Sequence, residues 1–332
     1  MSFLRYVLML AVVLGACFLS STYSEHHSTN NENAFEGLYM HLMPAALVHG
    51  EHAPEATHGD AEAGHGAEAV HHVAGEGDYL LAINVPLPAW ADGAPGIEGS
   101  QIVLTNLQIF QIAAVILIFL AFSGVPGYLR TGKGDWLTRM MTGFVLFIRD
   151  EMVVPNLGKE DGRRFLPFFC SLFFFIVFIN LMGLVPGSVT PTANIFVTMA
   201  LSLVTLASMV GLGMAAQGPV AFWKNLVPHV PGWMWPMMFF IEVVGLFIKP
   251  FALMIRLFAN MTGGHMVVLS FMGLIFFVAG KEFNSIAWGV SVPAVGFGVF
   301  IMIIEAFVAL LQAYIFTQLS ALFVGACLHP EH

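Results

Sequence analysis

Long apolar segments alternate with short polar ones after residue 100, and this pattern predicts membrane-spanning helices. A helix needs about 20 predominantly apolar residues to cross a hydrocarbon core of about 30 Å. Five segments are long enough, and they cover residues 101–125, 165–185, 193–216, 236–279 and 288–326. The last two exceed the length of an upright helix. We therefore expect them to be steeply tilted or bent, with Pro250 and Pro293 as candidate bends.

A shorter segment between the first two membrane helices has a different pattern. Residues 136–153 combine aromatic and aliphatic residues with Arg139, Arg149, Asp150 and Glu151. Such mixing predicts an amphipathic helix on the membrane surface. The expected fold class is therefore an all-α membrane protein with five membrane-crossing helices, a surface amphipathic helix, and two long, tilted final helices. We expect the membrane domain to span residues 101–326 and a short cytoplasmic tail to cover 327–332.

The first 24 residues have the pattern of a secretory signal peptide. Arg5 supplies a positive charge near the start, an apolar segment covers residues 7–19, and small polar residues follow. The sequence LGAC, which ends at Cys17, also fits a lipoprotein cleavage site and would make Cys17 a lipidation site. Both alternatives start the next segment outside the cytoplasm.

Composition and charge support a polytopic membrane protein and exclude a large soluble core. Of the 332 residues, 58% are hydrophobic and 10% are charged, and the formal net charge is -9. None of the 12 Lys and Arg lies between Tyr6 and Leu129, whereas seven lie between the first two predicted membrane helices. By the positive-inside rule this loop is cytoplasmic, so the N-terminus is expected outside and the C-terminus in the cytoplasm.

Residues 25–100 form a separate acidic, His-rich segment. They hold nine of the 13 histidines and 12 of the 21 carboxylates. We expect a solvated, largely disordered extracytoplasmic extension. A metal-binding or proton-buffering arm is the alternative, because imidazoles bind metals and titrate near neutral pH, but no spacing defines a tetrahedral site. Cys17, Cys170 and Cys327 have no CxxC spacing and indicate neither disulfides nor a metal site.

Arg256 lies inside one of the long apolar segments, where an arginine costs about 2.5–3.5 kcal/mol on insertion scales. It belongs to a polar stripe at helical spacing, formed by Glu242, Lys249, Arg256, Asn260 and Gly263. The small residues Ala252 and Ala259 flank the arginine and leave a shallow surface that another helix can approach. We therefore expect Arg256 to face a partner.

The last predicted helix also contains polar residues. Glu305 and Gln312 are seven residues apart and share a face, next to a strip of small residues formed by Ala306, Ala309, Ala313, Thr317 and Ser320. An intramembrane carboxylate indicates a functional site by default. The alternative is a neutral glutamic acid that is hydrogen-bonded to a neighbouring helix.

Two further polar residues belong to this group. His265 follows Arg256 by nine residues, which places it about 13 Å farther along a straight helix and on the opposite side. Glu305 on the next antiparallel helix could approach it, and such a pair could carry protons. Asn180 is an isolated intramembrane amide that either bonds two helices together or lines a polar path.

These residues resemble subunit a of the F-type ATP synthase, the stator subunit of its membrane motor. The resemblance covers roughly residues 101–325. It rests on LPFFCSLFFFIVFINLMGLVPG from Leu166, RLFANMTGGH from Arg256, IEAFVALLQAYIFTQL from Ile304, and the Glu242 and Lys249 spacing upstream of the arginine. The family often has a carboxylate where this chain has His265 and a histidine where it has Glu305. An exchange between contacting positions preserves the pair.

The resemblance implies a proton-conducting stator subunit that couples proton translocation to rotation and ATP synthesis in a bacterial inner membrane. Arg256 would match the family's essential arginine, which faces the carboxylates of the c-subunit ring. Four residues would match the polar groups of the outer half-channel, namely Glu305, His265, Asn260 and Gln312. Glu242 would match a position of the inner half-channel, and Lys249 and Asn180 are additional polar candidates. The implied partners are the c-subunit ring, subunit b of the peripheral stalk, the catalytic head of the complex and the lipid bilayer. No cofactor, metal or nucleic acid is implied.

Two other functions remain open from the residues alone. A membrane metal-ion transporter would collect metal with the outer histidines and bind it with His265 and Glu305, although two ligands are too few for a closed site. A purely structural membrane scaffold would leave Arg256 without a role. The sequence has neither a GK[ST] phosphate loop nor an HExxH motif, so we predict that the chain is not an enzyme by itself.

Overall fold

The structure is a computed structural model that describes residues 2–23, 82–84, 97–98, 101–185, 190–227, 231, 233–279 and 285–328. Five helical segments within these residues are long and apolar enough to cross a membrane: Asn106–Thr131, Lys159–Gly183, Ile195–Gln217, Trp235–Ile275 and Gly289–Leu328. This finding confirms the predicted fold class of a membrane protein with five candidate crossings.

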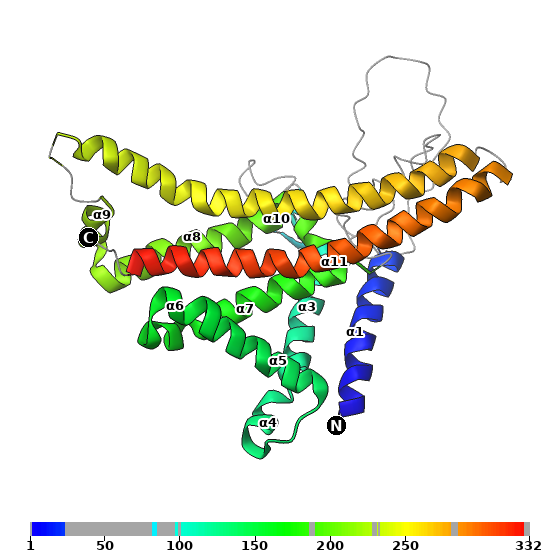
Figure 1. Cartoon of the computed structure of the whole chain (residues 1–332), viewed down its shortest axis with the longest axis horizontal. Helices are drawn as coiled ribbons and strands as arrows, with labels where there is room; N and C mark the ends of the chain where they lie inside the picture. The colour runs from blue at the N-terminus through cyan, green and yellow to red at the C-terminus, as the bar shows by residue number, and fades with distance from the viewer. Residues whose placement is uncertain are drawn as a thin grey trace, which may run out of the picture.

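The last two helices dominate the molecule. Helix α10 (Trp235–Ala279) has 45 residues and α11 (Ser285–Leu328) has 44. At 1.5 Å per residue each is about 65 Å long, roughly twice the thickness of a hydrocarbon core. Figure 1 shows the two helices side by side, running across the direction of α3 (Asn106–Phe122). Both helices continue through their internal prolines, Pro250 and Pro293, and α10 follows a bowed path.

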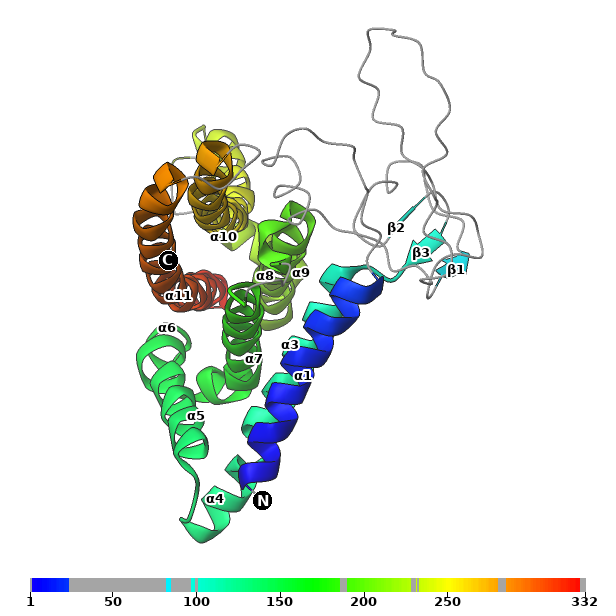
Figure 2. The same ribbon diagram turned by 90° about the vertical axis from the view of Figure 1, so that its right-hand side faces the viewer.

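Two further membrane helices support this pair. Helix α11 packs against α7 (Lys159–Gly183) and α8 (Ile195–Gln217), and α10 also packs against α8. The contact uses the strip of small residues on α11, of which Ala309, Ala313, Thr317 and Ser320 are fully buried. Small side chains let helix backbones approach closely in a membrane. Figure 2 shows the resulting bundle end-on.

Helix α3 begins later than predicted because the preceding residues form a strand. Residues Gln101–Val103 are β3, the central strand of a small antiparallel sheet with β1 (Ala82–Asn84) and β2 (Ile97–Glu98). The side chain of Gln108 then accepts a hydrogen bond from the Thr105 amide at 3.1 Å, which satisfies a free donor at the helix start. The sequence pattern did not predict this sheet.

The N-terminal segment is helical. Helix α1 (Ser2–Tyr23) packs along α3, and Ala16 is buried in this contact. At the other end of α1, the buried Arg5 donates to Thr138 Oγ1 at 3.0 Å and pairs with Asp135 at 3.5 Å. Removal of residues 1–24 as a signal peptide stays a prediction. Apart from strands β1 and β2, the acidic extension at residues 25–100 lies outside the described residues.

Short elements connect the long helices. The predicted amphipathic segment contains α5 (Trp136–Phe147), which continues as a π-helical segment, Ile148–Val153. Trp136 is 73% exposed, whereas Leu137 and Met141 are buried, so α5 is two-sided as expected. The other short elements are α4 (Val125–Thr131), α6 (Val154–Leu157), the 3-10 turn η3 (Pro191–Ala193) and α9 (Pro219–Asn225). Helix α9 was not predicted, and α11 extends to Leu328, into the predicted tail.

Candidate functional site

Helix α10 has two different faces around Arg256. Leu246, Leu253 and Leu257 are at most 2% exposed and lie on the face that packs against the rest of the chain. Arg256 lies on the opposite, exposed face. The neighbouring positions on that face are also exposed, namely Ala252, Ala259, Asn260 and Gly263. The structure therefore leaves the sequence-predicted stripe uncovered around the arginine.

The guanidinium of Arg256 has no partner among the residues that the structure describes. No ion pair or hydrogen bond to it is found within them. A charge at membrane depth without a partner is costly. The small residues beside it leave room for a second surface to approach closely. This arrangement fits a charge that is paired by another molecule.

His265 and Glu305 are brought together from α10 and α11. The His265 Nε2 and Glu305 Oε1 atoms are 3.7 Å apart, and the two side chains are 15% and 4% exposed. Gly264 makes this approach possible, because a Cβ at that position would lie 2.6 Å from Glu305 Oε1. The predicted meeting of these two residues across antiparallel helices is confirmed as a contact.

The carboxyl group of Glu305 is buried without a hydrogen bond. Neither of its oxygens has a hydrogen-bond partner among the described residues. Leaving a buried polar group unsatisfied costs about 1–3 kcal/mol. Within the described residues, no hydrogen bond joins the Glu305 carboxyl group to a neighbouring helix, and the polar contact that it makes there is with His265. A group held at such a cost next to an imidazole is suited to binding and releasing a proton.

Three other buried polar residues lie on or beside the helices that carry the pair or pack against them, and sequence reasoning missed one of them. Thr190, just before η3, is hydrogen-bonded through its Oγ1 atom to His265 Nε2. Asn180 donates to the Ala309 carbonyl at 3.5 Å and accepts from Thr192 at 2.7 Å, so it joins α7 to α11 and to η3. The side chain of Gln312 is 4% exposed, and Gln312 lies on the same face of α11 as Glu305, seven residues farther along. A hydroxyl in a Pro- and Gly-rich turn carries no sequence signal for contact with a distant histidine.

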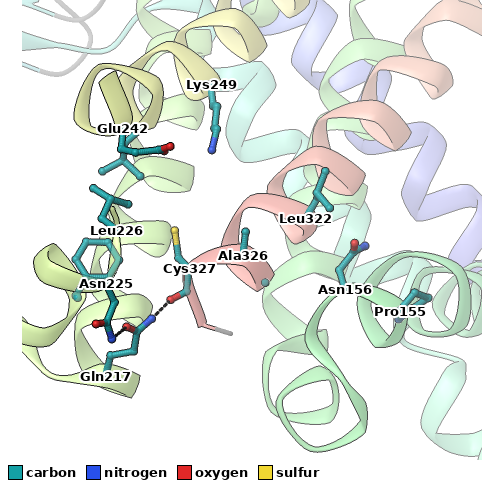
Figure 3. Close-up of a pocket in the computed structure, with 13 residues that line it drawn as sticks. Pro155, Asn156, Gln217, Asn225, Leu226, Glu242, Lys249, Leu322, Ala326 and Cys327 are labelled. Atoms are coloured by element: carbon teal, nitrogen blue, oxygen red, sulfur yellow. Dashed lines mark hydrogen bonds between the residues drawn. The ribbon is translucent and has the colours of Figure 1, made fainter. Parts of the chain in front are cut away.

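A second polar region lies at the opposite end of α10. A cavity of about 640 Å³ is lined by residues from α6, α9, α10 and α11 (Figure 3). Glu242 and Lys249 line it from α10, and Asn156 lines it from α6. Gln217 donates to the Cys327 carbonyl at 2.6 Å and accepts from Asn225 at 3.1 Å at its edge. The ammonium of Lys249 also lies 5.4 Å from the centre of the Phe323 ring.

Arg256 lies between the two polar regions along α10. It follows Glu242 by 14 residues, about 21 Å, and precedes His265 by nine, about 13 Å. The structure thus separates the candidate residues into three groups. Glu242 and Lys249 line the cavity, and Arg256 and Asn260 lie on the uncovered face. His265 and Glu305 meet between α10 and α11, while Asn180 bonds α7 to α11 and Gln312 is buried on α11.

The described residues contain no cluster of three or more His, Cys, Asp or Glu side chains that could hold a metal ion. His265 and Glu305 alone supply two ligands, whereas a tetrahedral site needs four and a catalytic one usually has three from the protein. The intramembrane pair therefore does not fit a metal site by itself.

Comparison with known proteins identifies similar sequences. The ATP synthase A chain family model matches residues 108–325. ATP synthase subunit a of Myxococcus xanthus is 46% identical over 201 residues, which cover 60% of this chain and 63% of that protein. ATP synthase subunit a of Chloroherpeton thalassium is 39% identical over 315 residues, 89% of this chain and 90% of the relative. The subunit a of Chlorobium phaeobacteroides strain DSM 266 is 37% identical over 301 residues, 88% of this chain and 85% of the relative.

Proposed function

This chain belongs to the ATP synthase A chain family, and from that premise we propose that it is the proton-conducting stator subunit of an F-type ATP synthase. Its role is to couple proton translocation to rotation of a c-subunit ring. It forms no chemical bond itself, because ATP is made in the catalytic head of the complex. The observation that carries the proposal is Arg256, which is exposed on an uncovered face between two separate polar regions and has no partner in the part of the chain that the structure describes.

The uncovered face around Arg256 is the surface against which the c-subunit ring rotates. A ring carboxyl group that arrives at Arg256 loses its proton, because the arginine favours the charged form. At about 4 Å and an effective dielectric of about 20, two opposite charges attract by about 4 kcal/mol. The same positive charge repels protons and so prevents a direct leak across the membrane between the two polar regions. Ala252, Ala259 and Gly263 allow the close approach that this pairing requires.

The outer half-channel is formed by His265, Glu305, Asn260 and Gln312. The Glu305 carboxyl group and the His265 imidazole are 3.7 Å apart, close enough to exchange a proton after a small movement or through one water. Glu305 and Gln312 lie on one face of α11. Asn260 lies one helical turn beyond Arg256 on the ring-facing side. Protons therefore pass from the buried pair toward the ring through these side chains.

The inner half-channel opens through the cavity lined by Glu242 and Lys249. Its volume of about 640 Å³ leaves room for several waters. Polar side chains from α6 and the α8–α9 region complete its wall, as Figure 3 shows for Asn156, Gln217 and Asn225. Glu242 provides a carboxylate that accepts protons released from the ring. The separation of this cavity from the His265–Glu305 pair gives two offset paths rather than one continuous pore.

The remaining assignments concern orientation and partners. The chain lies in a bacterial plasma membrane with its C-terminus in the cytoplasm, since the basic segment around Arg130, Lys133 and Arg139 favours the cytoplasm. Arg5 at the start of α1 contacts Asp135 in this segment, so the start of α1 lies on the same side, and removal of residues 1–24 would leave the new N-terminus outside. Subunit b of the peripheral stalk holds it against rotation and connects it to the catalytic head. In this orientation the cavity at Glu242 opens to the cytoplasm and the His265–Glu305 pair to the outside.

ATP-driven acidification of vesicles that carry the whole complex tests the proposal. Arg256→Ala is expected to abolish pumping at equal membrane assembly. Arg163→Ala is the matched control, because Arg163 is an exposed arginine at the start of α7 and belongs to neither polar region. Persistent pumping in Arg256→Ala would overturn the stator assignment. Pumping that requires an added metal ion would instead support a metal-ion transporter.

A further inference from the structure

We propose that Thr190 is a positioning residue for His265, which holds Nε2 of the imidazole beside Glu305 and selects the nitrogen that carries the hydrogen. This inference rests on the proposed proton-conducting function. The inference is based on the buried hydroxyl of Thr190, which is hydrogen-bonded to two groups. Thr190 is 1% exposed, and its Oγ1 atom bonds both His265 Nε2 and the Gly183 carbonyl oxygen.

The backbone around Thr190 is held in place from several sides. Thr192, two residues on, donates to Asn180 on α7 at 2.7 Å. The carbonyl of Ala193 accepts a hydrogen bond from Thr262 on α10 at 3.3 Å. The amide of Ala193 donates to the carbonyl of Thr190 at 3.0 Å. The turn that carries Thr190 is therefore fixed to the helix of His265 and to α7, so the hydroxyl has little freedom to move away.

Gly183 provides the space for the Thr190 side chain. It is the last residue of α7, and a Cβ at this position would collide with the Oγ1, Cγ2 and Cβ atoms of Thr190. Thr190 donates its hydroxyl hydrogen to the Gly183 carbonyl at 3.2 Å. A glycine at the end of α7 thus admits the threonine and also supplies its acceptor.

The number of hydrogens that each group can donate determines the direction of the hydrogen bond between Thr190 and His265. A hydroxyl has one hydrogen to donate and two lone pairs to accept with, whereas a carbonyl oxygen only accepts. With the hydrogen directed at Gly183, the Thr190 oxygen faces His265 with a lone pair. Nε2 must then carry a hydrogen and donate it, which leaves Nδ1 as the bare nitrogen of the neutral ring. Thr190 therefore favours the Nε2–H form of His265.

This form gives the ring a defined path for a proton. A proton that arrives at Nδ1 converts the neutral ring to an imidazolium, and the hydrogen on Nε2 is the one released toward Glu305 Oε1, 3.7 Å away. The ionised carboxylate becomes a neutral acid, and the ring is left neutral with its hydrogen on Nδ1, so a second transfer in the same direction requires the ring to return to its Nε2–H form. The Thr190 hydroxyl then turns and donates to the bare Nε2. One hydroxyl thus serves His265 as an acceptor before the transfer and as a donor after it.

Few other titratable groups face His265 in the part of the chain that the structure describes. Glu305 is the one in contact from α11. Helix α8 has no ionisable residue, and those of α7 lie in its first half, between Lys159 and Cys170. Arg256 precedes His265 by nine residues on α10 and lies on its other face. A change in the pH dependence of transport after substitution of Thr190 therefore reports on the His265–Glu305 pair.

The test compares three variants of the complete complex in vesicles. Thr190→Val keeps the shape of the side chain and removes the hydroxyl, and Thr190→Ser keeps the hydroxyl. Thr198→Val is the matched control, because Thr198 is equally buried and its hydroxyl bonds only carbonyls at the start of its own helix α8. The rate of ATP-driven pumping is measured across a pH series at equal assembly.

Thr190→Val is expected to slow pumping about two- to tenfold, the effect of losing one net hydrogen bond. It is also expected to move the midpoint of the pH profile to lower pH, because the imidazolium loses an acceptor for Nε2–H. Thr190→Ser should restore both, and Thr198→Val should leave the midpoint unchanged. A wild-type midpoint in Thr190→Val, or a serine variant that behaves like valine, would overturn the positioning role. The proposed function would stand in that case if Arg256→Ala still abolished pumping, and it would fail separately if Arg256→Ala pumped normally.

Discussion

Two arginines in apolar helices, Arg5 and Arg256, are treated in opposite ways by the rest of the chain. Arg5 on α1 is 7% exposed, donates to Thr138 and pairs with Asp135. Gly124 leaves room for its guanidinium, since a Cβ there would collide with Nη1. Arg256 on α10 is exposed and has no partner among the described residues. Among the described residues, the chain thus supplies partners for Arg5 and none for Arg256.

Under the proposed function, the difference separates a charge that stabilises the fold from a charge that acts on a partner. Both residues incur the cost of an arginine in an apolar segment. Arg5 recovers part of this cost through contacts that join α1 to Asp135 and Thr138 at the start of α5. Arg256 has no such contact among the described residues, which fits a partner in another molecule. Substitutions at the two positions should therefore change different measured quantities.

The largest effect is expected for Arg256→Lys. Lysine keeps the charge but lacks the planar, two-donor geometry with which arginine binds a carboxylate. Coupled pumping should fall by at least about 100-fold, as expected for the loss of a positioned charge contact, while the assembled complex keeps its thermal stability. ATP-driven acidification and a thermal melt of the same preparation measure both. Normal pumping in the lysine variant would show that the charge alone is sufficient.

The next largest effect on pumping is expected at the buried pair of His265 and Glu305, in which both partners belong to this chain. His265→Glu places two carboxyl groups together, and like charges at contact distance disfavour ionisation. This single variant should lower pumping by roughly 100-fold. The double variant His265→Glu with Glu305→His restores one acid and one imidazole, so it should recover part of the rate. A double variant as inactive as the single one would show that the order of the two residues matters.

Two adjacent glycines give a smaller, more local comparison. Gly264→Ala would put a methyl group 2.6 Å from Glu305 Oε1, whereas Gly263→Ala would meet nothing within 4 Å on the uncovered face. Displacing a proton-transfer group by about 1 Å can cost up to about 100-fold, so Gly264→Ala should slow pumping clearly more than Gly263→Ala. The pair of variants is matched for helix propensity. Equal losses would mean that clearance for Glu305 is not what Gly264 provides.

The smallest effect on transport is expected for Arg5→Gln. Its charged hydrogen bond contributes about 1.5–3 kcal/mol locally, so hydrogen exchange along α1 should become faster while pumping stays within about twofold. Leu4→Ala is the control, because Leu4 is 62% exposed and outside this contact. Peptides from residues 2–23 that are absent from the mature chain would instead support their removal as a signal peptide.

The predicted helices and their observed bounds agree closely where the pattern is long. The segments predicted at 236–279 and 193–216 are α10 (Trp235–Ala279) and α8 (Ile195–Gln217). The first helix was predicted to begin at residue 101 but begins at Asn106, because Gln101–Val103 pairs with strands β1 and β2. Strand pairing depends on a partner elsewhere in the chain, and apolar length alone does not encode it.

The sequence by itself determined which residues share a helix face. At 3.6 residues per turn, spacing alone put Arg256 with Asn260 and Gly263, and put His265 on the other side of α10. It also identified Glu305 as an intramembrane acid that needs a partner. These conclusions depend only on the periodicity of one element.

Only the tertiary structure decided which groups meet between elements. Thr190 and His265 are 75 positions apart, and Arg5 and Thr138 are 133 apart. Both contacts depend on glycines, Gly183 and Gly124, whose missing side chains leave space that no local pattern reveals. Side-chain clearance and hydrogen-bond direction arise when helices pack in three dimensions, and a linear sequence records neither.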